Sequence, residues 1–235
     1  MEGQTEPGKA ELMQGIVFDL DGTLVDSVYE HVLAWREALD QEGIELSVWR
    51  IHRKVGMSGG LFANALLRET GRDVTAQQAE RLSRLHAEAY IRRSAGVRAL
   101  PGTSQLLSLL TELEVPWAIA TSGSRMTAGS AIESLGVPEG VPVVTRDEVS
   151  RAKPDPDLFL AAADRLHLGV NDLVVVGDSV WDMLAAQRAR ALGVGLLSGG
   201  YGEEELDHAG AYRVYEDPAD LLRHLDEIGV RLPSV

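Results

Sequence analysis

Residues 15–27 read GIVFDLDGTLVDS, in which an apolar run ends on two aspartates separated by one residue. The three residues before Asp19 are apolar, which is typical of a strand that is buried on both faces of a parallel sheet. Side chains alternate along an extended chain, so Asp19 and Asp21 leave the strand on the same side. Two carboxylates beside an apolar wall repel each other unless a cation lies between them. The stretch therefore predicts half of a metal site.

The composition excludes several classes of partner and site. The 235 residues include 22 Lys and Arg against 36 Asp and Glu, a net charge of −14, which disfavours nucleic acid and anionic membranes as partners. The absence of cysteine excludes disulfides and thiolate metal sites. No apolar run approaches the roughly 20 residues that a membrane span needs, and residues 1–14 lack the apolar segment of a signal peptide. We expect a cytoplasmic protein with a loose leader of about ten residues.

The order of predicted elements indicates the fold class. After residue 98, apolar strands alternate with amphipathic helices. The strands are expected at 116–121, 141–145 and 172–178, and 194–200 is expected to form a strand followed by a loop. The helices are expected at 103–114, 124–136, 154–169, 180–193 and 218–229. Such alternation is typical of an α/β fold with a doubly wound parallel sheet, as in Rossmann-like domains.

Between the first strand and residue 98 the pattern is helical throughout. Val28, Val32, Trp35 and Leu39 recur at helical spacing, and further helical stretches cover 59–71 and 75–93. We read this block as an insert. The prediction is a Rossmann-like core of residues 12–25 and 98–235 with an inserted all-helical cap domain of residues 26–97.

Polar side chains follow the apolar strands at the sheet edge where ligands of open α/β sheets collect. These side chains come from Asp19 and Asp21, from ATSGS at 120–124, from Asp178 and Asp182, and from Lys153 in a polar loop. Carboxylates without histidine suit Mg²⁺, which binds through a few carboxylates and substrate phosphate oxygens. Lysine adds a second cation for a dianionic group. The chemistry this favours is phosphoryl transfer, which needs positioning and charge neutralisation.

Four short motifs, in this order and spacing, resemble the signatures of the haloacid dehalogenase superfamily. They are Asp19-Leu20-Asp21-Gly22-Thr23, Thr121-Ser122-Gly123, Lys153-Pro154, and Gly177-Asp178-Ser179 with Asp182. The resemblance runs from residue 15 to about residue 230. The helical insert resembles the branch whose cap follows the first strand, which includes phosphoglycolate phosphatase-like and β-phosphoglucomutase-like proteins.

The resemblance implies a role for each aspartate. Asp19 would be the nucleophile that forms an aspartyl-phosphate, and Asp21 the general acid and then the general base. Mg²⁺ would bind the Asp19 carboxylate, the Asp21 backbone carbonyl and the Asp178 carboxylate. Asp182 would lie nearby, either as a water-mediated metal ligand or as the partner of Lys153.

The resemblance also implies how the phosphoryl group is held. Thr121 and the amides of Ser122 and Gly123 would bind its oxygens, and Lys153 would neutralise charge on the nucleophile and on the transferring group. Without the matching motifs, Lys153 reads as a solvated loop residue and Thr121 as a helix cap.

A calcium-binding loop is a competing interpretation of the first motif. Glu30 would supply its twelfth position, but the sixth position would be Leu24, where that loop needs glycine. Asp178 and Asp182 also have ordinary interpretations, as a helix cap and as an acid that the helix dipole favours.

Two cap residues are predicted to bind substrate. Arg53 lies in RIHRK at 50–54, the densest basic run, next to the flexible-looking GMSGG at 56–60. His31 lies on the apolar side of its helix. A solvated helix face for Arg53 and cap packing for His31 are the structural alternatives.

We therefore predict a Mg²⁺-dependent phosphatase that acts on a small phosphomonoester, as a monomer or weak dimer. The alternative is a sugar phosphomutase, which would need a cationic anchor in the cap. In β-phosphoglucomutase-like proteins an arginine follows the cap's Gly-x-Ser turn, whereas Gly59 stands there in this chain. A dehalogenase would lack the second aspartate, and a non-catalytic regulator would not need all four of Asp19, Asp21, Lys153 and Asp178.

Overall fold

A six-stranded parallel sheet forms the core of the protein. The computed structural model describes residues 14–57, 59–71 and 75–230, and in this part of the chain the strands follow the order β3-β2-β1-β4-β5-β6. The strands are β1 (Gly15–Phe18), β2 (Trp117–Ala120), β3 (Val143–Val144), β4 (Leu173–Gly177), β5 (Leu192–Leu196) and β6 (Ala211–Tyr215). All neighbouring strands are parallel. The predicted Rossmann-like α/β fold is confirmed.

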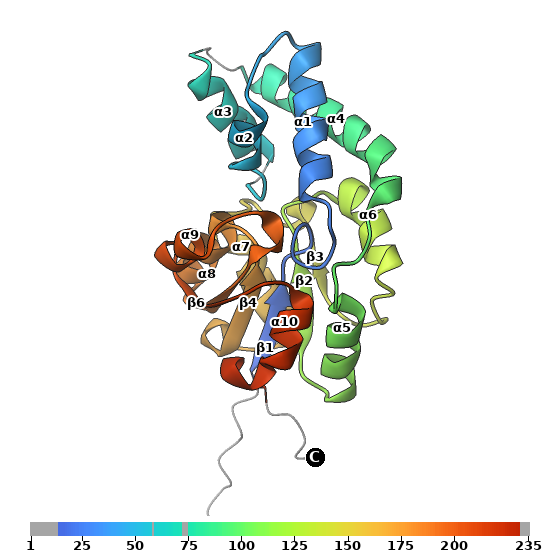
Figure 1. Cartoon of the computed structure of the whole chain (residues 1–235), viewed down its shortest axis with the longest axis vertical. Coiled ribbons are helices and arrows are strands. Elements are labelled where there is room, and N and C mark those ends of the chain that lie inside the picture. Colours follow the sequence, from blue (N-terminus) through green and yellow to red (C-terminus); the bar gives the residue numbers. More distant parts are fainter. Residues whose placement is uncertain (1–13, 58, 72–74, 231–235) are drawn as a thin grey trace, which may run out of the picture.

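Helices cover both faces of the sheet, which explains why its central strands are apolar throughout. On one face, Ile16 and Phe18 pack with α5 (Thr103–Glu112), α6 (Arg125–Ser134) and α10 (Pro218–Arg223). On the other face, Val17 packs with α7 (Asp157–Leu166) and α8 (Val180–Ala189). Figure 1 shows this layered core in the lower half of the molecule.

The helical block lies beyond the carboxyl ends of the strands, above the core in Figure 1. It consists of α1 (Val28–Gln41), α2 (Val48–His52), α3 (Gly59–Glu69) and α4 (Ala76–Arg93). These helices share an apolar cluster of their own, which includes Trp35 and Phe62. We call this block the cap. Its boundaries at residues 26 and 97 stay a prediction.

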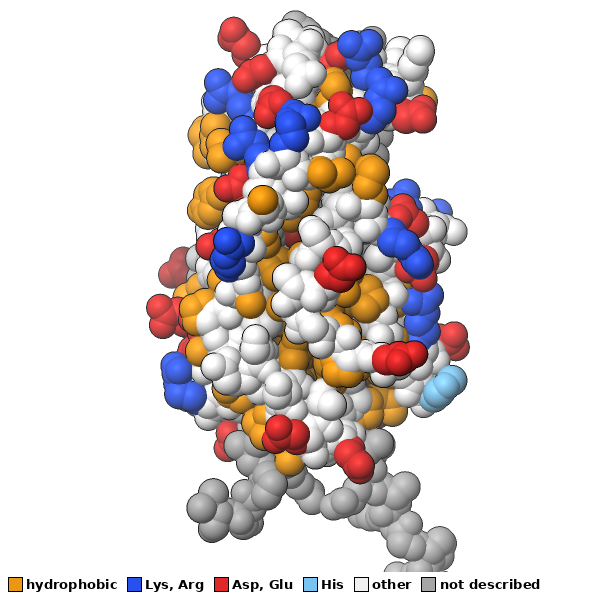
Figure 2. Space-filling model, turned by 90° about the vertical axis from the view of Figure 1, so that its right-hand side faces the viewer, with side chains coloured by type: hydrophobic (Ala, Val, Ile, Leu, Met, Phe, Trp, Pro, Cys, Tyr) orange, Lys and Arg blue, Asp and Glu red, His pale blue; other side chains and the backbone are white. Residues whose placement is uncertain are grey.

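Charged side chains of both signs are interleaved on the cap face shown in Figure 2. Arg92 and Arg93 of α4 both pair with Glu37 of α1. These basic residues therefore meet acids of the same protein, as expected for an acidic chain. Within the part of the chain that the structure describes, no helix is both long enough and apolar enough to cross a membrane.

The structure corrects several predicted boundaries. The helix expected at 180–193 ends at Ala189, because Arg190 adopts a left-handed conformation with φ 66°. Gly193, the last residue of that expected helix, lies inside β5, paired with Val175 of β4. Gly59 and Gly60 fell both in the flexible-looking GMSGG and in the helical stretch expected at 59–71, and the structure places them at the start of α3. Ser58 and the expected leader lie outside the described residues.

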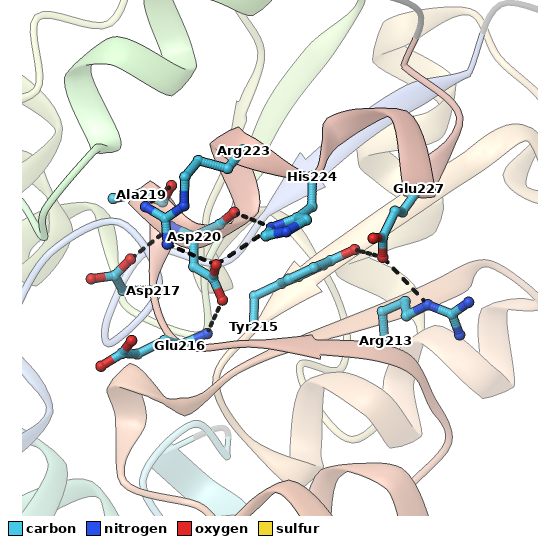
Figure 3. Close-up of polar contacts among 9 residues, drawn as sticks. All are labelled: Arg213, Tyr215, Glu216, Asp217, Ala219, Asp220, Arg223, His224 and Glu227. Atoms are coloured by element: carbon cyan, nitrogen blue, oxygen red, sulfur yellow. Dashed lines mark hydrogen bonds and ion pairs between the residues drawn. The ribbon is translucent and has the colours of Figure 1, made fainter.

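Two elements near the C-terminus were missed. The first is α9 (Glu203–His208) and the second is β6, an edge strand with partly exposed residues. Figure 3 shows the polar contacts that hold β6 to the following segment. The Tyr215 ring stacks on His224, and its hydroxyl donates a 3.1 Å hydrogen bond to Glu227. His224 also ends α10, so the helix expected at 218–229 continues only as a 3-10 turn.

Candidate active site

A fully buried lysine lies between two carboxylates at the carboxyl edge of the sheet. Asp19 follows β1, and its amide still donates to Val176 of β4, so the strand fixes its position. Lys153 Nζ lies 2.5 Å from Asp19 Oδ1 and 2.7 Å from Asp182 Oδ1, and its side chain is 0% exposed. A buried lysine is stable only with such partners. The structure therefore brings Asp19, Lys153 and Asp182 together.

Asp178 completes an acidic cluster with Asp19 and Asp182. It follows β4, and carboxylate oxygens of these three residues lie within 4.8 Å of one another. Thr23 Oγ1 donates a 3.0 Å hydrogen bond to Asp178 Oδ1. Gly199 approaches so closely that a Cβ there would overlap the Asp178 carboxylate. Three buried carboxylates facing one lysine fit a divalent cation with oxygen ligands.

The pKa shifts in the acidic cluster indicate that the three carboxylates face too little positive charge. Burial raises the pKa of Asp19 to about 7, against the opposing effect of Lys153 and with the support of Asp182. Burial raises the pKa of Asp178 well above its usual value, and the negative charges of Asp182 and Asp19 add to this effect. Burial would lower the pKa of Lys153, but the two carboxylates outweigh it and raise that pKa above its usual range. Lys153 is therefore charged, and the carboxylates still need a cation.

Both oxygens of Asp182 are in use within the protein. Oδ1 pairs with Lys153, and Oδ2 accepts from the Ser179 amide at 3.1 Å and from the Ser179 hydroxyl at 2.5 Å. This reciprocal cap starts α8. Of its two predicted roles, the structure shows the pairing with Lys153, and water-mediated metal binding stays a prediction.

Asp21 faces the cap instead of the acidic cluster. Its Oδ1 accepts from Ser27 Oγ at 2.6 Å and lies 3.1 Å from His31 Nε2. Burial opposes ionisation, but His31 and Ser27 lower the pKa of Asp21 below its ordinary value. These contacts therefore favour the ionised form of Asp21, which is the form that can accept a proton.

The segment after β2 has the properties of an oxyanion site. The Gly123 amide donates a 2.9 Å hydrogen bond to Thr121 Oγ1, and Ser124 caps α6 by accepting from the Thr127 amide. The buried Ser122 hydroxyl has no hydrogen-bond partner among the described residues. A free hydroxyl at the start of a helix can donate a hydrogen bond to an anionic oxygen. The binding role of the Gly123 amide stays a prediction, since this amide is engaged by Thr121.

A pocket of about 360 Å³ lies between the core and the cap; Asp19 and Asp21 line it, whereas Lys153, Asp178 and Asp182 do not. Its core side is lined by Asp19, Asp21, Thr121, Ser122, Gly123, Ser124, Thr127, Arg146 and Asp147, and its cap side by His31, Trp35, Val55, Gly56, Met57, Phe62, Ser83, His86 and Ala87. The pocket is therefore a site between core and cap, with the Asp19 carboxylate on its core side.

Arg53 is not among the residues that line this pocket. Its guanidinium pairs with Glu205 and lies 4.4 Å from the centre of the Tyr201 ring. The Tyr201 hydroxyl in turn donates to the Arg53 carbonyl at 2.9 Å. Arg53 therefore joins the cap to the core in the structure, whereas its predicted contact with substrate stays a prediction.

Sequence reasoning gave no role to Thr23, Ser27 or His86. Thr23 and Ser27 lie inside the stretch 15–27, where their hydroxyl groups were the available signal. His86 lies on α4 and contacts His31, with 3.1 Å between His86 Nε2 and His31 Nδ1. No local pattern marks it, because only the packing of α4 against α1 brings the two rings together.

Comparisons with known proteins find relatives that are named as phosphatases. Hexitol phosphatase A of Escherichia coli is 35% identical over 179 residues, which are 75% of this chain and 79% of that protein. Phosphoglycolate phosphatase of Rhodospirillum rubrum is 32% identical over 216 residues, 88% of this chain and 89% of that protein.

Solved structures show the same fold. A hydrolase from Pseudomonas syringae is 56% identical, with a TM-score of 0.90 over 92% of this chain and 100% of that one. A putative β-phosphoglucomutase from Bacteroides vulgatus, 21% identical with a TM-score of 0.82 over 91% of this chain and 88% of that one, shares the fold. The model of the haloacid dehalogenase-like hydrolases matches residues 13–190. The chain therefore belongs to the haloacid dehalogenase-like hydrolase family.

Proposed function

We propose that the protein is a Mg²⁺-dependent phosphatase that hydrolyses a small phosphomonoester through an aspartyl-phosphate on Asp19. The observation that carries the proposal is the fully buried Lys153 held between Asp19 and Asp182. Ser122, whose hydroxyl has no hydrogen-bond partner among the described residues, lines the same pocket as Asp19. This arrangement supports a carboxylate nucleophile next to fixed positive charge. The names of the two phosphatase relatives support the same class of reaction, that of phosphoric monoester hydrolases.

The first step transfers the phosphoryl group to the enzyme. A carboxylate oxygen of Asp19 attacks phosphorus while the bond to the leaving oxygen breaks, and Asp21, once protonated, gives its proton to that oxygen. Lys153 balances negative charge on Asp19 and on the transferring group. The ionised form of Asp21 is favoured by His31 and Ser27. The approach of a phosphate dianion would raise the pKa of Asp21 and favour its acid form.

The second step returns Asp19 to its starting form. Asp21, now ionised, takes a proton from water, which attacks phosphorus as the bond to Asp19 breaks and inorganic phosphate leaves. The His31 and Ser27 contacts favour this base form. Because the same residue acts as acid and then as base, each turnover restores its starting state.

The donor set supports a hard divalent cation beside the nucleophile. The Asp19 and Asp178 carboxylates and the Asp21 carbonyl would hold Mg²⁺, with Thr23 orienting Asp178. When bound, the metal would reduce repulsion between the carboxylates and an incoming phosphate dianion.

The sugar phosphomutase alternative needs a second anionic anchor in the cap. Arg53 would be that anchor, but in the structure it pairs with Glu205 and lies outside the pocket lining. Among the described lining residues, the cap contributes no lysine or arginine. A cap lining without these cations favours water over a second phosphorylated ligand as the acceptor of the phosphoryl group.

The proposal is tested by phosphate release from p-nitrophenyl phosphate, together with rapid-quench labelling by a ³²P-labelled substrate. We expect turnover that EDTA abolishes and Mg²⁺ restores, and a transient protein-bound label in the wild type. Asp19→Asn should reduce kcat to background and remove the label. Asp164→Asn, an exposed carboxylate of α7, is the matched control and should retain both.

Two results would contradict the proposal. The first is full activity after exhaustive chelation. The second is turnover by Asp19→Asn at the rate of the Asp164→Asn control. Supplying β-glucose 1-phosphate with a trace of its 1,6-bisphosphate tests the alternative, because isomerisation that outpaces phosphate release would identify a mutase.

A further inference from the structure

A short segment of the cap contacts the core beside the proposed metal ligand Asp178. His52 Nε2 lies 2.8 Å from the Gly199 carbonyl oxygen. Gly56 approaches Ser179, the residue after Asp178, so closely that an added Cβ would lie 2.9 Å from Ser179 Oγ. His52 and Gly199 are not among the described residues that line the pocket. The contact between them is therefore separate from the contacts that a substrate would make.

The hydrogen bond between His52 and Gly199 has one possible direction. A carbonyl oxygen only accepts, so His52 Nε2 is the donor whether the ring is neutral or charged. The ring is packed between the two parts of the protein. Tyr29 of α1 stacks on it with 5.4 Å between ring centres, and Tyr201 of the core lies against it at 5.7 Å. Packing from both sides therefore fixes the donor in place.

The loop that accepts this bond, residues 197–200, follows β5 and contacts two segments of the site. Gly199 approaches Asp178 so closely that an added Cβ would overlap its carboxylate. Ser198 Oγ donates a 2.6 Å hydrogen bond to the Gly22 carbonyl in the first motif. A Cβ at Gly22 would also lie only 2.5 Å from Asp178 Oδ2. The loop is therefore joined to the cap through Gly199 and to the metal-binding side of the site through Ser198 and Gly199.

These contacts leave the Asp178 carboxylate little freedom to rotate. Its Oδ1 accepts from Thr23 Oγ1 at 3.0 Å, and its Oδ2 lies against the backbone at Gly199. Carboxylate oxygens of Asp19 and Asp182 lie within 4.8 Å, and their repulsion favours any rotation that moves Asp178 away. The Gly199 backbone opposes that rotation. Outer contacts that orient a ligand in this way tune the affinity of a metal site.

We propose that His52 and Ser198 are positioning residues for the metal site, and that the docked cap, through His52, holds the loop 197–200 against Asp178. This inference rests on the Mg²⁺ site of the proposed function and adds a dependence of metal affinity on the cap. Such coupling is reciprocal, so bound metal would stabilise the docked cap by the same factor. The ion pair of Arg53 with Glu205 also joins cap and core, but it contacts α9 instead of this loop.

The test measures the Kd of Mg²⁺ by isothermal titration calorimetry without substrate. His52→Ala and Ser198→Ala should each raise this Kd about threefold to tenfold, the effect of one lost hydrogen bond. His52→Gln keeps an amide donor and should stay within about twofold of the wild type. Ser94→Ala removes an exposed hydroxyl of the cap, and Glu205→Gln removes the charge paired with Arg53. Both controls should stay within about twofold of the wild type.

A second measurement separates metal positioning from contact with substrate. Phosphate release from p-nitrophenyl phosphate should need more Mg²⁺ in His52→Ala and in Ser198→Ala, and kcat should return to within about twofold of the wild-type value at saturating Mg²⁺. A kcat that stays low at saturating Mg²⁺ would count against positioning of the metal.

The calorimetry also gives the results that would overturn the inference. They are an unchanged Kd in His52→Ala or in Ser198→Ala, and a loss in His52→Gln or in Glu205→Gln as large as that in His52→Ala. These results leave the phosphatase function intact, because they compare variants of an enzyme that binds metal. A wild type that neither binds Mg²⁺ nor hydrolyses p-nitrophenyl phosphate would instead overturn the proposed function, and the inference with it.

Discussion

Removing the charge of Lys153 is the sharpest perturbation of the site. Lys153→Met keeps most of the side-chain volume but leaves Asp19 and Asp182, which lie 2.5 and 2.7 Å from the amine, without their shared cation. Because the group is 0% exposed, solvent cannot replace that charge. Breaking a buried ion pair by removing one partner costs about 3–5 kcal/mol. We expect this loss in the free energy of unfolding at pH 8 in EDTA.

The loss should depend on pH through Asp19. Burial already raises the pKa of this group to about 7, and Lys153 opposes that rise, so its removal raises the pKa further. A carboxyl whose pKa is raised on folding stabilises the folded state at low pH and loses that contribution as the pH rises through its folded-state pKa. In Lys153→Met the stabilising contribution of protonated Asp19 should still be falling at pH 8. The destabilisation should therefore be about 1 kcal/mol smaller at pH 6 than at pH 8.

Urea denaturation followed by tryptophan fluorescence measures both values. Lys54→Met is the matched control, because Lys54 pairs with Glu69 on the cap and is partly exposed. Its loss should cost less than about 1 kcal/mol at either pH. In parallel, Lys153→Met should lower kcat by roughly 10²–10³-fold. A variant as stable as the wild type in EDTA at pH 8 would refute the reasoning that this amine balances the buried carboxylates.

Three further predictions concern the metal-binding side of the site. Burial raises the pKa of both Asp19 and Asp178, so protons compete with Mg²⁺ for these carboxylates. Mg²⁺ should therefore raise Tm more at pH 8 than at pH 5.5, and an equal rise at the two pH values would contradict this. Thr23→Val removes the hydrogen bond to Asp178 and should weaken Mg²⁺ binding, measured by calorimetry, about 10–100-fold. Gly199→Ala should abolish Mg²⁺ binding because its Cβ would overlap the Asp178 carboxylate, whereas Gly129→Ala, where the added Cβ meets open space, should retain it.

The core of the site could be predicted because its residues follow from strand geometry. Asp19 and Asp178 each come directly after a buried strand, and β1 and β4 are neighbours in the sheet. Lys153 could be placed only through its motif, since it lies in an irregular loop and its burial results from tertiary packing. Thr23 was within the quoted stretch, but which hydroxyl meets which carboxylate depends on how the turn after β1 folds.

The cap could be predicted as a block but not in its contacts. Helical spacing identified α1 and α4, yet the contact of His31 with His86 depends on the rotation of one helix against the other. Arg53 had a charge suited to an anion, but Glu205 from the core competes for it. Likewise β6 was missed because an edge strand with partly exposed residues lacks the continuous apolar run of the central strands.

Asp182 shows why a structural and a functional interpretation of one residue need not exclude each other. An acid in the first turn of a helix is favoured by the helix dipole and by the reciprocal cap that it forms with Ser179. That cap engages only Oδ2, and it holds the side chain so that Oδ1 faces Lys153. The start of α8 therefore positions the lysine, and the lysine positions the charge beside Asp19. Because one carboxylate serves the helix and the site together, the stability of this edge of the sheet and the charge balance of the nucleophile depend on the same residue.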